Sequence, residues 1–586
     1  MREIKEEAMA SQRHKNDRQQ KLILAIAAVV LIIIVVGITA LTTYVKKYSP
    51  SKEQSDYKSY YNLSGDDSIF VTFNETQMEQ NGILSDGEAY VHYDTVHNYL
   101  NSRFYWDPTD QILRYTIPEG LISIQPDTTE YKIGKEKKTA EHIPVLVRGD
   151  DMYLSLSFLQ MYTNIRYEVY ENPGRVAISN HWDEVSFTTV KKATQIREKG
   201  GVKSPVLKEL KKDDLVTEIE TVDSWVKVCS QDGFIGYVKK KALGKTQEVL
   251  YDNNYMEPQF SHISKDFKIN LAWHQVTNTS ANAHVKDVLG KTKGVNVISP
   301  TWFYLNDNNG NIASLASEDY VRYCHSQGVE VWALVSNLEN AEVDTTQVLS
   351  TTSSRDTLVN NLIAEAIKYN FDGINIDFEA LKAEAGDGYL QFIRELSLKC
   401  ENNDLVLSVD NYVPAPYNAF YRLDEQQVFA DYIILMAYDE HYKGSSEGSV
   451  ASLGYVSQGV ADSLESVPAG QLILGIPFYT RVWELTPSTD ANTDTPYTVS
   501  SEAVGMSEAE SRVAANGATL NWLDDCGQYY AEYEHNGNTY KIWLEDQNSI
   551  EKKLEVMTTN NLAGAAFWKL GYEKNSVWDT IMKYMK

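Results

Sequence analysis

An octapeptide at residues 372–379, with the sequence DGINIDFE, alternates polar and apolar side chains. Successive side chains of a β-strand point to opposite faces, so Asn375, Asp377 and Glu379 share one face and the apolar residues share the other. Two residues of strand advance about 6.6 Å, which lets Asp377 and Glu379 reach one small ligand and couple electrostatically. The pattern therefore predicts a strand that delivers carboxylates into a cavity. Asp372 has the opposite parity and, with Gly373, is predicted to start the strand and anchor neighbouring backbone.

Short apolar runs alternate with helical stretches through the second half of the chain. They cover residues 269–273, 295–304, 329–335, 374–378, 405–409, 432–436, 472–476 and 563–568. This alternation predicts an α/β fold with a closed (β/α)8 TIM barrel, and β-branched runs suit strands buried on both faces. Chemistry in such barrels gathers at the carboxyl ends of the strands, where Glu379, Tyr438 and Trp568 lie.

Extra sequence lies between the predicted seventh and eighth strands, at residues 481–549. Two aromatic runs there flank Asn536-Gly537, which predicts a hairpin with a tight turn. We expect an α+β insertion that forms one wall of the cleft.

The octapeptide resembles the Asp-x-x-Asp-x-Asp-x-Glu signature of glycoside hydrolase family 18, which contains chitinases and N-acetylglucosaminidases. Asn375 departs from it, because many members carry Asp there, and this departure is similar to cortex-lytic members. Further motifs resemble the sixth strand (residues 436–439, continued by Glu440-His441-Tyr442), the seventh (474–479) and the eighth (567–573). The resemblance covers residues 262–586.

Membership would imply retaining, substrate-assisted hydrolysis in which the substrate's own acetamido group replaces a protein nucleophile. The resemblance then makes Glu379 the general acid, Asp377 the group that orients the acetamido N–H, and Tyr438 a donor to the acetamido oxygen. Trp568 would form the floor beneath the sugar. Because an amide cannot share a proton, Asn375 is expected to alter the acid limb of the pH profile.

Further cleft residues are predicted from strand-end position or motif context. For the tryptophans among them, core packing is an equal alternative. The set comprises Met436, Asp439, Glu440, Trp273, Trp302, Asp410, Trp483 and Trp332.

The N-terminus is predicted to be a membrane anchor. Leu22–Val45 is 24 residues long without a charge, enough to span a bilayer. Six basic residues precede it and only Lys46 and Lys47 follow at once, so residues 1–21 are expected in the cytoplasm and the catalytic domain outside it. Residues 46–67 are polar and predict a linker.

Residues 68–182 contain an internal repeat, in which residues 90–101 align with residues 153–164 and each copy precedes a predicted hairpin. The duplicated α+β module resembles the copper amine oxidase N-terminal domain, without bringing a metal site. Residues 186–245 predict a small all-β barrel that resembles bacterial Src-homology-3-like domains. The resemblance implies wall-peptide binding, and a rigid spacer is the alternative.

Charge and cysteine content exclude several classes of function. A formal net charge of −27 leaves no basic footprint for nucleic acid. The four scattered cysteines lack metal-ligand or redox spacing, so no cofactor and no metal are expected, and the thiols are predicted to be reduced and mostly buried.

Three functions remain open at this point. The first is a membrane-tethered hydrolase cutting beside N-acetylglucosamine in peptidoglycan, the second a chitinase using the same residues, and the third a non-catalytic carbohydrate-binding protein. The presence of Glu379 disfavours the third.

Overall fold

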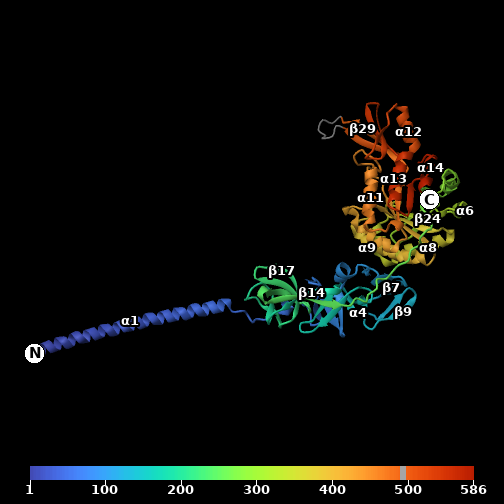
Figure 1. The fold of residues 1–586 in the computed structure, drawn as a ribbon. Helices are drawn as coiled ribbons and strands as arrows, with labels where there is room; N and C mark the ends of the chain where they lie inside the picture. Colours follow the sequence, from blue (N-terminus) through green and yellow to red (C-terminus); the bar gives the residue numbers. More distant parts are fainter. Residues whose placement is uncertain (489–496, 586) are drawn as a thin grey trace. The chain divides into compact units, whose positions relative to one another are not determined.

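The computed structural model describes residues 1–488 and 497–585 (Figure 1). The chain forms two compact units. One contains residues 1–100 and 146–256, and the other contains residues 101–145 and 257–586.

A closed parallel barrel forms the centre of the second unit. In the described residues its eight strands are β21 (Ile269–His274), β22 (Val297–Leu305), β24 (Glu330–Ser336), β25 (Gly373–Asp377), β26 (Val406–Tyr412), β27 (Tyr432–Met436), β28 (Leu472–Pro477) and β34 (Gly564–Trp568). β21 pairs with both β22 and β34, which closes the barrel. The predicted TIM barrel is confirmed.

Helices surround the barrel. They are α5 (Val285–Leu289), α6 (Glu318–Ser326), α7 (Thr345–Ser350), α8 (Thr352–Tyr369), α9 (Gly386–Glu401), α10 (Leu423–Phe429), α11 (Leu453–Leu464), α13 (Gln547–Thr559) and α14 (Val577–Tyr584); β23 (Ile312–Ser314) extends the sheet beside β22. Apolar residues on the outer faces of the strands pack against these helices, and a second cluster fills the barrel interior. The barrel interior leaves no room for a side chain at Gly373, because a Cβ there would lie 2.8 Å from Cδ1 of Trp332.

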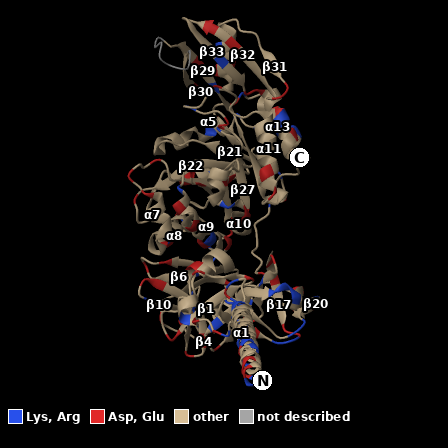
Figure 2. Ribbon diagram, turned by 90° about the vertical axis from the view of Figure 1, so that its left-hand side faces the viewer, with Lys and Arg blue, Asp and Glu red and all other residues tan. Residues whose placement is uncertain are grey.

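The insertion between β28 and β34 is an α+β unit, as predicted. Its sheet, whose strands are labelled in Figure 2, has the order β30 (Tyr497–Gly505), β29 (Tyr479–Pro487), β33 (Asn538–Leu544), β32 (Gln528–His535), β31 (Asn521–Leu523). Helix α12 (Met506–Ala515) packs on this sheet. Asn536 and Gly537 both have positive φ, at 54° and 82°, as a type I′ hairpin turn requires. Residues 489–496 of this predicted insertion lie outside the described residues.

Residues 101–145, although they lie within the predicted module of residues 68–182, belong to the same compact unit as the barrel. They form a meander of β5 (Tyr105–Asp107), β6 (Ile112–Ile117), β7 (Gly120–Ile124), β8 (Glu130–Ile133) and β9 (Glu136–Thr139). Asp107 accepts a hydrogen bond of 2.5 Å from the backbone N–H of Thr352, and Arg103 donates to Glu425 at 2.8 Å. These polar contacts attach the meander to the start of α8 and to α10.

The remaining module strands build a sheet in the first unit. They are β1 (Ser68–Phe73), β2 (Thr76–Gln77), β3 (Gly82–Ser85), β4 (Glu88–His92), β10 (Val145–Arg148), β11 (Asp151–Ser155), β12 (Arg166–Tyr170) and β13 (Arg175–Ser179), with α3 (Tyr93–Thr95) and α4 (Leu156–Gln160). The repeated segments place β4 and β11 side by side as antiparallel partners. Each repeat is thus a strand followed by a short helical stretch, as the internal alignment predicts.

An all-β element follows the module. It consists of β14 (Asp183–Val190), β15 (Thr194–Arg197), β16 (Val206–Leu210), β17 (Leu215–Val222), β18 (Trp225–Ser230), β19 (Ile235–Lys239) and β20 (Leu243–Tyr251) in one antiparallel sheet. Its strands extend beyond the predicted limits of 186 and 245 at both ends. All four cysteines lie in the described parts of the chain and are free, and three of them are buried.

The N-terminal helix α1 (Arg2–Tyr48) contains the predicted apolar span and is long and apolar enough to cross a membrane. The predicted linker at residues 46–67 is wrong in part. Ser51 donates its N–H to the carbonyl of Val202 at 2.7 Å, and Tyr61 is buried with its ring 3.8 Å from that of Phe70. Aromatic burial therefore ties the end of this segment to the first unit.

Candidate active site

Polar side chains converge at the carboxyl ends of β25, β26 and β27. Glu379 follows β25 by two residues, Tyr412 ends β26, and Tyr438 follows β27. Parallel strands of a barrel present these ends at one rim, where catalytic groups collect in such folds.

Glu379 is held from two sides. The hydroxyl of Tyr412 donates to its Oε2 at 2.9 Å, and the side chain of Asn337 bonds both its backbone N–H (2.8 Å) and its carbonyl (3.0 Å). Burial raises the pKa of Glu379, the hydrogen bond from Tyr412 lowers it, and the nearby charges of Asp439 and Glu339 raise it again. The net raised pKa favours the protonated acid that a proton donor needs.

Asp377 lies on the interior side of Glu379 and is left with an unfilled acceptor. Its Oδ1 is buried and has no hydrogen-bond partner among the described residues. Burial, followed by the charges of Asp410, Glu379 and Glu339, raises its pKa well above the ordinary value. A ligand N–H at this position would satisfy the free oxygen.

Asn375 is fully buried beneath this carboxyl and its amide orientation is determined. Its Oδ1 accepts hydrogen bonds of 3.0 Å from both the indole N–H of Trp273 and the hydroxyl of Ser299. Its Nδ2 must therefore face Asp410, to which it donates at 2.7 Å. Asp410 is 2% exposed, and burial raises its pKa although the bond from Asn375 lowers it. Asp410, predicted as a cleft residue, is thus buried and contacts Asn375.

Tyr438 and Trp568 keep partial exposure at the rim. The Tyr438 ring lies 6.3 Å from that of Tyr479, and the Trp568 ring lies 5.9 Å from that of Trp273. Burial and the carboxylates led by Asp410 raise the pKa of Tyr438 well above its ordinary value, so its hydroxyl stays a donor.

The other residues predicted at this rim differ in their exposure and in their contacts. Asp439 is exposed, accepts a hydrogen bond of 2.7 Å from the hydroxyl of Tyr479 and lies 3.7 Å from Arg481. Met436 ends β27 and is 8% exposed. Glu440 accepts the backbone N–H of Ser452 at 2.8 Å, which anchors the start of α11, and its role in the cleft stays a prediction.

The predicted cleft tryptophans are mostly core residues. Trp302 donates to Asn282 at 2.8 Å and packs outside the barrel, and Trp483 donates to the carbonyl of Gly448 at 2.8 Å within the insertion. Trp332 fills the barrel interior beside Tyr432. The buried rings of these three tryptophans, with N–H groups already satisfied or enclosed, fit the alternative of core packing. Trp273 is 1% exposed and supports Asn375 from below.

Asp372 has the predicted anchoring contacts. Its Oδ2 accepts the backbone N–H of Val331 at 2.7 Å and contacts Nε2 of His325 at 2.8 Å. It lies at the start of β25, at the opposite end of the strand from the carboxyl pair.

Sequence reasoning missed Tyr412, Asn337 and Glu339. Tyr412 shares strand parity with Asp410, which is a signal that could have found it. Asn337 and Glu339 lie in the loop after β24 and follow no periodic pattern. Across residues 1–488 and 497–585, no group of three or more His, Cys, Asp or Glu side chains could hold a metal ion.

Comparison with known proteins assigns two parts of the chain. The model of "Glycosyl hydrolases family 18" matches residues 259–573, and that of "Copper amine oxidase N-terminal domain" matches residues 70–178. The Uncharacterized glycosylase YvbX of Bacillus subtilis is 25% identical over 320 residues, which cover 51% of this chain and 90% of that protein.

Two further comparisons concern the same region. The Cortical fragment-lytic enzyme of Bacillus subtilis is 24% identical over 283 residues, covering 46% of this chain and 63% of that enzyme. The crystal structure of the C-terminal domain of a chitinase-like protein from Desulfitobacterium hafniense matches with a TM-score of 0.50 and 20% identity, over 55% of this chain and all of that domain, which supports the fold.

Proposed function

Because the chain belongs to glycosyl hydrolases family 18, we propose that it is a membrane-anchored glycosidase that acts outside the cytoplasm. It cleaves β-1,4 linkages beside N-acetylglucosamine in peptidoglycan, with retention of configuration. The observation that carries the proposal is the pairing of Glu379, whose raised pKa favours the acid form, with the unfilled buried acceptor of Asp377.

Glu379 acts as the general acid and then as the general base. Its proton passes to the glycosidic oxygen as the bond to the anomeric carbon breaks, and its carboxylate later removes a proton from the attacking water. The hydrogen bond from Tyr412 and the two bonds from Asn337 hold the carboxyl group and its backbone in one position. Fixed geometry of this kind reduces the entropy lost on reaching the transition state.

Asp377 acts on the substrate's acetamido group. Its free Oδ1 accepts the acetamido N–H, and this contact turns the acetamido oxygen toward the anomeric carbon as internal nucleophile. The hydroxyl of Tyr438, kept protonated by burial, donates to that oxygen and opposes the wrong rotation of the group. Trp568 offers an apolar face beneath the sugar ring.

The accessory parts favour a wall polymer as substrate. An apolar helix of membrane-spanning length precedes the catalytic unit, and the excess of basic residues before it favours a cytoplasmic N-terminus. The relatives named Cortical fragment-lytic enzyme support an activity on cell-wall glycan over one on chitin.

Product analysis tests the proposal with the full chain in detergent micelles. Purified peptidoglycan and chitin oligosaccharides are incubated separately with the wild type, with Glu379→Gln, and with Glu318→Gln as a control at an exposed helix position. Mass spectrometry should find wall fragments with new N-acetylglucosamine reducing ends for the wild type and the control only. Cleavage of chitin alone would replace the wall substrate by chitin, and binding without cleavage would leave a carbohydrate-binding protein.

The stereochemistry is measured separately. Proton NMR of the first products should show the β-anomer, because substrate-assisted displacement inverts the anomeric carbon twice. An initial α-anomer would contradict the retaining mechanism.

A further inference from the structure

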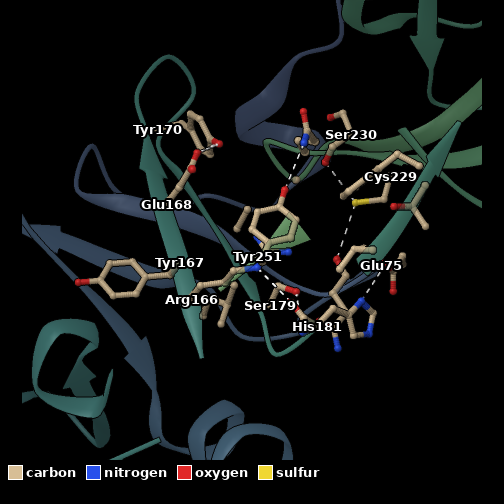
Figure 3. A pocket seen from close by; sticks show the side chains of 18 residues that line it. Glu75, Arg166, Tyr167, Glu168, Tyr170, Ser179, His181, Cys229, Ser230 and Tyr251 are labelled. Carbon is tan, nitrogen blue, oxygen red and sulfur yellow. Dashed lines mark hydrogen bonds and ion pairs between the residues drawn. The ribbon is translucent and has the colours of Figure 1, made fainter. Parts of the chain in front are cut away.

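A cavity of about 310 Å³ lies in the first unit, away from the residues of the barrel site. One wall is the end of the module sheet, with Arg166, Glu168 and Tyr170 of β12. The opposite wall comes from the all-β element, with Phe187 of β14 and Tyr251 of β20 (Figure 3). The cavity is therefore built jointly by two domains that adjoin in sequence.

Arg166 is the central cation of this cavity. Its guanidinium carbon lies 3.6 Å from the centre of the Tyr251 ring, and its Nε donates to the backbone carbonyl of His181 at 3.2 Å. Stacking and one backbone bond fix the plane of the guanidinium. In the described chain neither of its terminal nitrogens has a hydrogen-bond or ion-pair partner, so the two groups that make a bidentate fork are unused.

The acidic residues beside Arg166 have other partners. Glu75 lies 3.7 Å from Nδ1 of His181, and the hydroxyl of Tyr170 donates to Glu168. Gln231 donates to the hydroxyl of Tyr251 at 3.4 Å and so supports the ring on which Arg166 stacks. The chain has a net charge of −27, yet the guanidinium of Arg166 pairs with no acidic side chain among the described residues. It is therefore suited to bind an anionic ligand.

The walls indicate what else the ligand contains. Aromatic rings and hydroxyl or amide groups line the cavity, as in sites that bind organic ligands and not bare ions. β12 is the last strand in the order of its sheet, so among the described residues one of its backbone edges has no strand partner. An extended peptide can pair with such an edge through its own N–H and C=O groups.

We propose that this cavity binds the carboxyl-terminal residue of an extended peptide, with the terminal carboxylate paired to both free nitrogens of Arg166. The aromatic rings contact the last side chain, and β12 offers backbone groups to the residue before it. The two domains would then hold one ligand between them. The site is independent of glycosidase activity.

Isothermal titration of the full chain in detergent micelles tests the proposal. The probes are acetyl-Ala-Ala-Ala with a free carboxylate, the same peptide with a carboxyl-terminal amide, and sodium acetate. The variants are Arg166→Gln, Arg166→Lys and, as a control at an exposed arginine of the same module, Arg148→Gln. Thermal melting of each variant establishes that it is folded.

The free acid should bind, and the amide should bind at least about tenfold more weakly, since the amide lacks the charge that the bidentate fork of Arg166 pairs with. Arg166→Gln should lose the same factor, Arg166→Lys should keep part of the affinity because it keeps charge without the fork, and Arg148→Gln should bind as the wild type does. Equal binding of acid and amide, unchanged binding by a folded Arg166→Gln, or acetate binding as tightly as the peptide would each overturn the proposal.

Discussion

The hydrogen bond between Asn375 and Asp410 can be tested by exchanging the amide and the carboxylate between these two positions and measuring stability and activity. In the wild type the amide of Asn375 donates to Asp410 at 2.7 Å. Asn375→Asp keeps an acceptor for Trp273 and Ser299 but points its second carboxylate oxygen at Asp410. Two like charges about 4 Å apart repel by about 4 kcal/mol at an effective dielectric constant of about 20. This value is an upper bound, because the pair can bind a proton, so we expect a loss of about 3 kcal/mol in unfolding free energy at pH 7.

The double variant Asn375→Asp/Asp410→Asn should recover most of that loss. Its amide, now on β26, can donate to the carboxylate on β25, so the number of buried charges and hydrogen bonds returns to that of the wild type. The coupling free energy of the cycle should reach about 2 kcal/mol or more. Because this carboxylate pair lies directly under Asp377, kcat/KM should fall at least about tenfold in Asn375→Asp and recover in the double variant.

Chemical denaturation and pH-resolved kinetics measure both quantities. Asn411→Asp is the matched control. Asn411 is buried as Asn375 is, but it lies on β26 and exchanges hydrogen bonds of 2.9 Å with Gln426 and, within the described part of the chain, none with Asp410. Asp410→Asn should not rescue it. Additive losses in the double variant, or equal rescue of the control, would refute the coupling. The single variant Asp410→Asn should also gain stability relative to the wild type as pH rises above about 4, because the raised pKa means that ionised Asp410 destabilises the folded state.

Three further changes test other contacts. Tyr412→Phe removes the hydrogen bond that lowers the pKa of Glu379, so the alkaline limb of the pH profile of kcat/KM should move to higher pH; an unmoved limb would show that the 2.9 Å contact does not act on the acid. Burial raises the pKa of Asp431 to about 6, so stability should fall by up to about 3 kcal/mol between about pH 4 and 7, and Asp431→Asn should flatten this slope in melting curves recorded at several pH values. Glu395→Gln leaves the charge of the fully buried Arg355, whose Nε contacts Glu395 at 3.0 Å, without a partner. The unfolding free energy in denaturant titrations should fall by about 3–5 kcal/mol, and a loss below about 1 kcal/mol would contradict the buried pair.

Much of the fold could be predicted because its signals are local. The strand periodicity of residues 372–379 depends only on the geometry of an extended chain, and β25 indeed forms there, with Asn375 and Asp377 in the strand and Glu379 two residues after its end. The Asn536-Gly537 turn depends only on the tolerance of two residues for positive φ.

The site could be predicted only in part, because neighbours from other strands complete it. Motif position predicted Glu379 and Tyr438 as site residues, but a tryptophan at a strand end can face either the cleft or the packed outer layer. Trp302 and Trp483 are buried because Asn282 and the carbonyl of Gly448 meet their N–H groups from distant parts of the chain. Tyr412 was missed for the same reason, since its contact with Glu379 joins residues on two strands.

The sequence by itself determined the barrel strands, the spacing of the carboxylates and the apolar length of α1, because each follows from the preferences of neighbouring residues. Only the tertiary structure decided that residues 101–145 share a compact unit with the barrel, whereas the second copy of the repeat belongs to the other unit. Asp107, Tyr105 and Arg103 find partners on the barrel at Thr352, Ser350 and Glu425. A repeat specifies similar local structure in both copies, whereas the side chains that differ between the copies select the surface against which each one packs.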